Sequence, residues 1–166
     1  STQAQYTTAG RPVIEIDGTN VVAGEENGLW ITGGNTTIRG LVINRFGDDG
    51  IDIEFNGGNT IVGNYVGTDV TGLIARPNVW GINIKTPNNV IGGATAPDRN
   101  VVSGNSDDGF YLYNANGTGN TIQGNYIGIG ADGTTPRGNG DEGIYLHTSG
   151  NANTIGGTSA DARNVI

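Results

Sequence analysis

A short phrase recurs along this chain of 166 residues: a glycine, followed by an apolar, a variable and a second apolar residue. Apolar residues that alternate with a period of two, interrupted by glycine every few positions, favour short β-strands and exclude an α-helix. The copies read GLWI from Gly28, GIDI from Gly50, GINI from Gly81, GFYL from Gly109 and GIYL from Gly143.

Two further apolar segments follow each copy, so the pattern holds three strands per period. The first is led by asparagine, as in NTIVGN from Asn59, and the second is a short apolar run, as in LVI from Leu41. The 22 residues from Gly28 to Gly50 accommodate three strands and three turns, which is one coil of a three-faced solenoid. The sequence therefore predicts an all-β chain: a right-handed parallel β-helix of roughly 5–6 coils over residues 13–166, preceded by an N-terminal arm or cap at residues 1–12.

Longer coils of two kinds alternate along the chain. One kind carries its insertion after the third strand, as TDVTGLIARPNV at 68–79 and IGADGTTPRGN at 129–139. The other kind carries it after the second strand, as ATAPDR at 94–99 and TSADAR at 158–163. Because insertions in solenoids fall in loops, the strands are expected to keep their register.

Composition narrows the class of protein. The formal net charge is −8, and an acidic chain lacks the Lys/Arg surface that nucleic acid requires. The absence of cysteine excludes a disulfide framework and a thiolate metal site, and no apolar run is long enough to span a membrane. We expect a secreted or cell-surface protein.

The alternation also divides side chains into inward and outward sets. Asn64 and Asn125 fall at the same turn two coils apart, where stacked amides can form an asparagine ladder or act simply as turn residues. The predicted inward residues are Leu29 and Ile31, Ile51 and Ile53, Ile82 and Ile84, Phe110 and Leu112, and Ile144 and Leu146.

The outward positions of the first strand form two columns. The first column reads Trp30, Asp52, Asn83, Tyr111 and Tyr145, and the second reads Thr32, Glu54, Lys85, Tyr113 and His147.

The chain ends at Asn164-Val165-Ile166, at a point where the Gly81 coil continues as NVVSGNSDDG. We expect the C-terminal coil to be incomplete, with further repeats of the same chain or neighbouring subunits stacking on the open coil ends. In the second case the segment Ser1–Gly10 is the expected strand donor.

The NTIxGNYIG and GIYL phrases resemble the parallel β-helix repeats of the pectin-lyase-like superfamily, and are most similar to secreted or surface-anchored bacterial repeat proteins. In enzymes of that superfamily the corresponding face carries a saccharide cleft. The resemblance thus implies polysaccharide binding, although ordinary cross-strand pairs on an exposed sheet explain the same residues and are favoured. The ligand-binding candidates are Trp30, Asn83, Tyr111, Tyr113 and Tyr145.

Catalytic candidates lie on the same face. Asp52 and Glu54 share one side of a strand, and paired carboxylates serve glycoside hydrolysis. An ion pair between Glu54 and Lys85 explains these residues equally well. In the pectin-degrading hydrolases of the superfamily that this chain resembles, NTD, DD, GHG and RIK blocks follow one another along the sequence. Here GDDG and NIKT match two of these blocks only weakly, GHG is missing, and His147 lacks glycine neighbours. An enzyme is therefore not favoured.

Acidic pairs precede several of the strand-opening glycines. Carboxylates on adjacent coils would repel one another, which a bound calcium ion would relieve, whereas a solvated turn is the simpler interpretation and is preferred. The metal candidates are Asp48, Asp49, Asp107, Asp108, Asp141 and Glu142, and Glu25 and Glu26 belong to the same pattern.

Taken together, these patterns favour a structural and interaction module, a rigid segment of an extracellular surface protein, stalk or self-assembling filament. The alternative is a polysaccharide-binding or polysaccharide-degrading β-helix that uses the outward face of the first strand.

Overall fold

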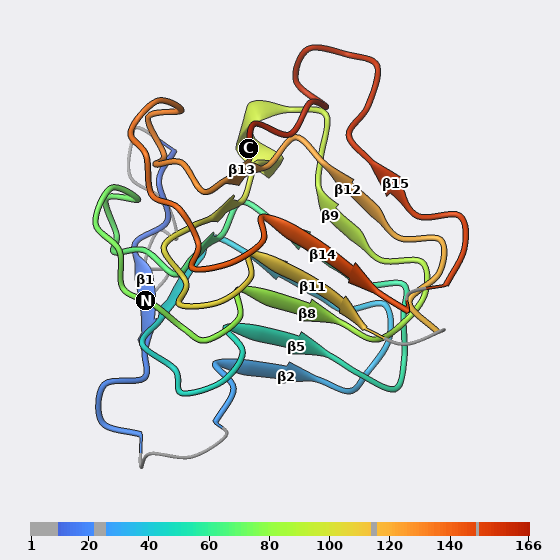
Figure 1. The fold of residues 1–166 in the computed structure, drawn as a ribbon, viewed down its shortest axis with the longest axis horizontal. Coiled ribbons are helices and arrows are strands. Elements are labelled where there is room, and N and C mark those ends of the chain that lie inside the picture. Colours follow the sequence, from blue (N-terminus) through green and yellow to red (C-terminus); the bar gives the residue numbers. More distant parts are fainter. Residues whose placement is uncertain (1–9, 22–25, 114–115, 149) are drawn as a thin grey trace, which may run out of the picture.

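The computed structural model describes residues 10–21, 26–113, 116–148 and 150–166, and these wind into stacked coils of three parallel sheets (Figure 1). Each sheet takes one strand from every coil, as the period of the sequence predicts. The first sheet contains β2 (Leu29–Ile31), β5 (Ile51–Ile53), β8 (Ile82–Ile84), β11 (Phe110–Tyr113) and β14 (Ile144–His147). The second contains β3 (Thr37–Arg39), β6 (Thr60–Val62), β9 (Val90–Gly92), β12 (Thr121–Gln123) and β15 (Thr154–Ile155). The third contains β1 (Ile14–Asp17), β4 (Leu41–Asn44), β7 (Tyr65–Val66), β10 (Val101–Val102) and β13 (Tyr126–Ile127).

The strands lie in strict vertical register. In the first sheet Ile51 pairs with Ile82 and Ile82 with Phe110, so equivalent positions of the repeat phrase stack directly. One apolar core runs up the inside of the solenoid, because these inward side chains are fully buried. The predicted inward set is confirmed over the middle coils. Leu146 differs: it is 43% exposed, because β14 is the edge strand of its sheet and no described coil covers it.

Asparagine ladders occupy the corners between the sheets. The ladder predicted from Asn64 and Asn125 is confirmed, and it gains rungs at Asn100 and Asn164. At each rung the side-chain Oδ1 accepts the backbone N–H and the Nδ2–H of the asparagine on the neighbouring coil; between Asn100 and Asn125 these distances are 3.3 and 2.9 Å. Two more ladders, which the sequence analysis did not separate, run through Asn59, Asn89, Asn120 and Asn153, and through Asn78, Asn105 and Asn139.

The close approach of the coils requires glycine at the start of the first four strands of the first sheet, at Gly28, Gly50, Gly81 and Gly109. A Cβ at Gly81 would lie 2.4 Å from the carbonyl oxygen of Gly109 and 2.6 Å from a methyl group of Val102. Any larger residue there would push neighbouring backbones apart and break the register.

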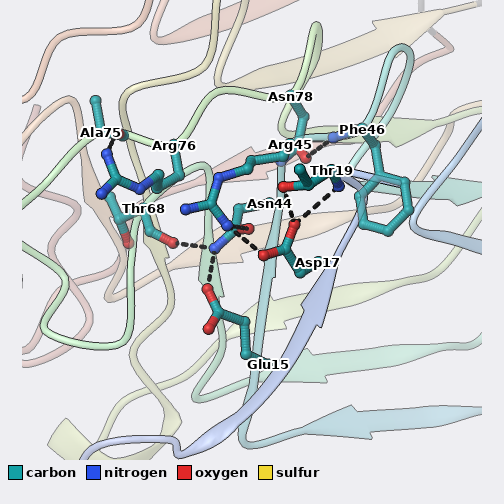
Figure 2. Close-up of polar contacts among 10 residues, drawn as sticks. All are labelled: Glu15, Asp17, Thr19, Asn44, Arg45, Phe46, Thr68, Ala75, Arg76 and Asn78. Atoms are coloured by element: carbon teal, nitrogen blue, oxygen red, sulfur yellow. Dashed lines mark hydrogen bonds and ion pairs between the residues drawn. The ribbon is translucent and has the colours of Figure 1, made fainter. Parts of the chain in front are cut away.

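Strand β1 is fastened to β4 by side chains at the outer edge of the third sheet (Figure 2). The buried Asn44 donates through Nδ2 to Glu15 Oε1 at 2.8 Å and to the carbonyl oxygen of Thr68 at 2.9 Å. Beside it, Asp17 pairs with Arg45 and accepts the backbone N–H of Thr19 at 2.8 Å. These contacts join the first described strand to the next two coils.

Replacing Asn100 with alanine should lower the free energy of unfolding by about 2–4 kcal/mol, because four side-chain hydrogen bonds are lost and buried partners are left unpaired. Urea unfolding measures this. The exposed Asn151→Ala serves as the control and should change the free energy by less than about 0.5 kcal/mol.

Gly81→Ala should destabilise the fold by about 2–3 kcal/mol through the clash with the neighbouring coil. Gly138→Ala is the matched control, because nothing lies within 4 Å of a Cβ there. Equal thermal stability of the two variants would contradict the close stacking of coils at this corner.

Candidate functional site

The outer face of the first sheet carries the residues that the sequence analysis singled out. The cross-strand pairs Trp30–Asp52, Asp52–Asn83, Asn83–Tyr111 and Tyr111–Tyr145 confirm the first outward column. Tyr113 and His147 pair in the second column. Since stacked coils lie about 4.8 Å apart, the face extends roughly 19 Å from β2 to β14.

Aromatic rings gather on β11, β14 and the turn before β8, and we call this group the aromatic shelf: Trp80, Tyr111, Tyr113, Tyr145 and His147. The ring of Tyr111 is central, stacked on Trp80 at 5.7 Å between centroids and on Tyr145 at 5.5 Å. His147 contacts the tyrosines edge-on or at a tilt. Tyr113 and Tyr145 remain 43% and 37% exposed, so the shelf presents ring surface to solvent.

A polar cluster lies beside the shelf, on the coils that contain β2, β5 and β8. Lys85 Nζ donates to Asp52 Oδ2 at 2.9 Å, and Asn27 Nδ2 donates to the same oxygen at 3.3 Å. Asn83 Nδ2 donates to Asp49 Oδ2 at 3.0 Å. The predicted pairing of Lys85 with Glu54 is therefore corrected, because the lysine bonds to Asp52 instead.

Burial distinguishes this cluster from an open catalytic pair. Asp49, Asp52 and Asn83 occupy outward positions, yet each is at most 5% exposed beneath its neighbours. The Oδ1 atom of each residue is also buried and accepts no hydrogen bond among the described residues. In Asp49 and Asp52 this atom is the second carboxylate oxygen, and in Asn83 it is the single amide oxygen. A surface-bound saccharide would not reach these carboxylates directly.

Burial also sets the electrostatics of the cluster. It raises the pKa of Asp49 to about 7, partly offset by the hydrogen bond from Asn83. It raises the pKa of Asp52 as well, against the opposing effect of Lys85. For Lys85, burial lowers the pKa, but its hydrogen bond and ion pair with Asp52 outweigh this and leave the pKa raised.

The end of the face formed by β2 and β5 carries aromatic residues as well. Trp30, 60% exposed, donates through Nε1 to Glu54 Oε2 at 3.0 Å and lies 6.2 Å from the ring of Phe55. A hollow of about 420 Å³ opens here, lined in part by Glu54, Phe55 and Lys85.

His147 does not join the acidic candidates. It lies on β14, three coils from Asp52 and Glu54 at about 14 Å by strand spacing, and its described contacts are with the tyrosine rings. The four catalytic candidates therefore fall into two groups: Asp52, Glu54 and Lys85 at the polar cluster, and His147 in the shelf.

The acidic corner is less continuous than the sequence indicated. The backbone N–H of an opening glycine donates to the carbonyl oxygen of the residue that precedes the opening glycine of the next coil. The residues before the five opening glycines therefore stack in one column, which reads Asn27, Asp49, Trp80, Asp108 and Glu142. In this column Trp80 thus separates Asp49 from Asp108, and Asp108 and Glu142 are acidic neighbours. One position earlier, Asp107 and Asp141 are neighbours as well, since Asp141 N donates to the carbonyl oxygen of Asp107 at 3.2 Å. Asp108 Oδ1 accepts the backbone N–H of Glu142 at 2.9 Å, and burial raises the pKa of Asp108 to about 6.

Among residues 10–21, 26–113, 116–148 and 150–166, no group of three or more acidic, histidine or cysteine side chains is arranged to hold a metal ion. Glu25 lies outside the described residues. Calcium binding by Asp48, Asp49, Asp107, Asp108, Asp141 and Glu142 stays a prediction.

Sequence reasoning missed Trp80 and Asn27. Both residues directly precede an opening glycine, at the position where the other coils place an acidic residue. Aligning the residues that directly precede the opening glycines would have placed the indole of Trp80 on this face.

The fold and this face together define a parallel β-helix solenoid with an aromatic and polar outer sheet. The chain belongs to the right-handed β-helix family, since the family model described as "Right handed beta helix region" matches residues 5–160. No curated protein and no solved structure matches it significantly. No helix among the described residues is long and apolar enough to cross a membrane.

Stability should fall as the pH rises from about 4 to about 7. The pKa of Asp49 is raised from 3.8 to about 7 and that of Asp108 to about 6, so in this window the folded protein keeps protons that the unfolded chain has lost. The free energy of unfolding should drop by at most about 1.4 kcal/mol per pH unit for each group.

Asp49→Asn, which keeps an acceptor for Asn83, should flatten this slope. Asp132→Asn is the control, because hydrogen bonds from its own loop lower the pKa of Asp132 to about 2 and its titration lies below the window. Urea unfolding at several pH values measures the slope, and an unchanged slope in Asp49→Asn would contradict the buried, uncharged state of this group.

Proposed function

We propose that this chain is an extracellular polysaccharide-binding module that holds its ligand on the outer face of the first sheet. The aromatic shelf is the observation that carries the proposal. Stacked rings around Tyr111, with solvent-facing surface on Tyr113 and Tyr145, suit the CH faces of sugar rings.

Polar groups beside the rings supply the other half of saccharide recognition. Lys85 and Glu54 lie at the rim of the polar cluster and retain partial exposure, so they are available to sugar hydroxyls. Binding sites for small ligands commonly combine aromatic surface with a few placed polar groups. A flat face with aromatic groups at both ends suits an extended chain better than a single sugar.

Binding is favoured over cleavage on this face. A general acid must reach the glycosidic oxygen, and Asp49 and Asp52 are buried under neighbouring side chains. Glu54 is the more accessible carboxylate and accepts the indole N–H of Trp30, but the second carboxylate that hydrolysis would need, Asp52, is buried. A bound polysaccharide would therefore be held intact.

A second candidate is a purely structural role, as a rigid segment of a stalk or filament. The three asparagine ladders and the single continuous core favour it, because both make the solenoid stiff along its axis. Sedimentation of the purified 17.0 kDa chain tests it: concentration-dependent polymers support assembly, and a monomer at all concentrations argues against it.

Tyr111→Ala should weaken binding of any polysaccharide found on a glycan array by about tenfold, because it removes the centre of the stack. Val90→Ala, an exposed apolar residue on the second sheet, is the control and should bind normally. Affinity electrophoresis measures both variants.

A reducing-end assay on the same polysaccharide separates binding from cleavage. We expect no new reducing ends. Turnover that disappears in Asp52→Asn or Glu54→Gln would make the chain an enzyme, and equal affinity of Tyr111→Ala and the unsubstituted chain would remove the shelf from the ligand site.

A further inference from the structure

The third sheet carries a second, separate cavity on its outer face. Outward-facing Val42, Tyr65 and Val101 form a small apolar cluster that is distinct from the main core, with Tyr126 and Ala131 packed against it. A trough of about 440 Å³ lies over these residues. Its floor is the row Tyr65, Val101 and Tyr126, which are direct neighbours on β7, β10 and β13.

The two-coil repeat builds the walls of this trough. On one side the equivalent loops 68–79 and 129–139 stack, each closed by an antiparallel bridge, and Ala131 N donates to the carbonyl oxygen of Gly72 at 2.9 Å. Arg137 Nε also donates to the carbonyl oxygen of Leu73 in the preceding loop. On the other side stands the loop 94–99, which includes Pro97 and Arg99. Stacked walls of this kind give a preformed cavity.

Basic and phenolic groups face each other inside this acidic protein. Arg99 lies over the ring of Tyr126, 4.3 Å from guanidinium carbon to centroid, and donates through Nη1 to the phenolic oxygen at 3.1 Å. Its Nε donates to the carbonyl oxygen of Gly124 at 2.9 Å, which fixes the plane of the guanidinium. Arg11 lines the trough as well, close enough for its charge to act on Tyr65.

The one carboxylate among the described lining residues is turned toward its own loop. Asp132 Oδ1 accepts the backbone N–H groups of Thr134 at 3.0 Å and Thr135 at 2.9 Å, and Oδ2 accepts the hydroxyl of Thr135. The described polar groups that lie over the floor are therefore mainly hydrogen-bond donors.

We propose that this trough binds a small organic anion, with a carboxylate or phosphate group at the guanidinium groups of Arg99 and Arg11 and an apolar body against Leu73, Val101 and Ala131. A planar guanidinium held by fixed hydrogen bonds is well suited to anionic oxygen. The cavity volume falls in the range of small-molecule sites. The site lies on a different sheet from the aromatic shelf and does not depend on polysaccharide binding there.

Titration of the full chain with glucose 6-phosphate, glucuronate and neutral glucose tests the proposal, followed by NMR of the Ala131 methyl group. We expect saturable binding of at least one acid with a shift of that methyl signal, and no saturation by glucose. Arg99→Gln and Arg11→Gln should each weaken binding about tenfold, because a charged hydrogen bond is lost.

Arg163→Gln is the matched control. Arg163 closes the equivalent loop 158–163, is exposed, and does not line the trough, so its loss should leave affinity unchanged. Binding of only the phosphate or only the carboxylate identifies which anion the site takes. Absence of saturation by both acids, equal binding of glucose, or an equal loss in Arg163→Gln would overturn the proposal; circular dichroism of each variant separates lost binding from lost folding.

Discussion

Side-chain amides that hydrogen-bond from coil to coil fix the geometry on which everything else depends. Each rung of an asparagine ladder satisfies buried backbone groups at a turn and ties that turn to the same turn of the next coil. A strand three residues long has little cohesion of its own, so the corners hold the vertical register that the strands alone would not maintain.

That register creates the outer faces. Because equivalent positions stack about 4.8 Å apart, any residue type that recurs in the phrase becomes a column, and aromatic residues on neighbouring coils become a stack. Tyr111 and Tyr145 meet for this reason, although 34 positions separate them in the chain. The inserted loops 68–79 and 129–139 stack in the same register two coils apart, and for this reason they form one wall of the trough on the third sheet.

The repeat phrase predicted the sheets, their register, the central core and one ladder, since all four follow from period alone. The exposure of outward residues could not be predicted this way. Asp52 is buried because Lys85 and Asn27, from coils on either side, both reach its Oδ2 atom, and such contacts depend on side-chain length rather than on spacing. Trp80 and Asn27 were not predicted as part of the face, because the other three coils place an acidic residue at that position and the pattern indicated a corner of carboxylates. The trough depends on loop conformation, which the insertions in the sequence did not reveal.

Hydrogen exchange of the backbone amides at the ladder corners is the most direct test of this account. The N–H groups of Asn64, Asn89 and Asn105 each bond to a ladder oxygen on the next coil. The account predicts that all three exchange only through global unfolding, at one common free energy. Rapid exchange at these amides, while the strand interiors stay protected, would contradict the claim that the ladders hold the coils in register.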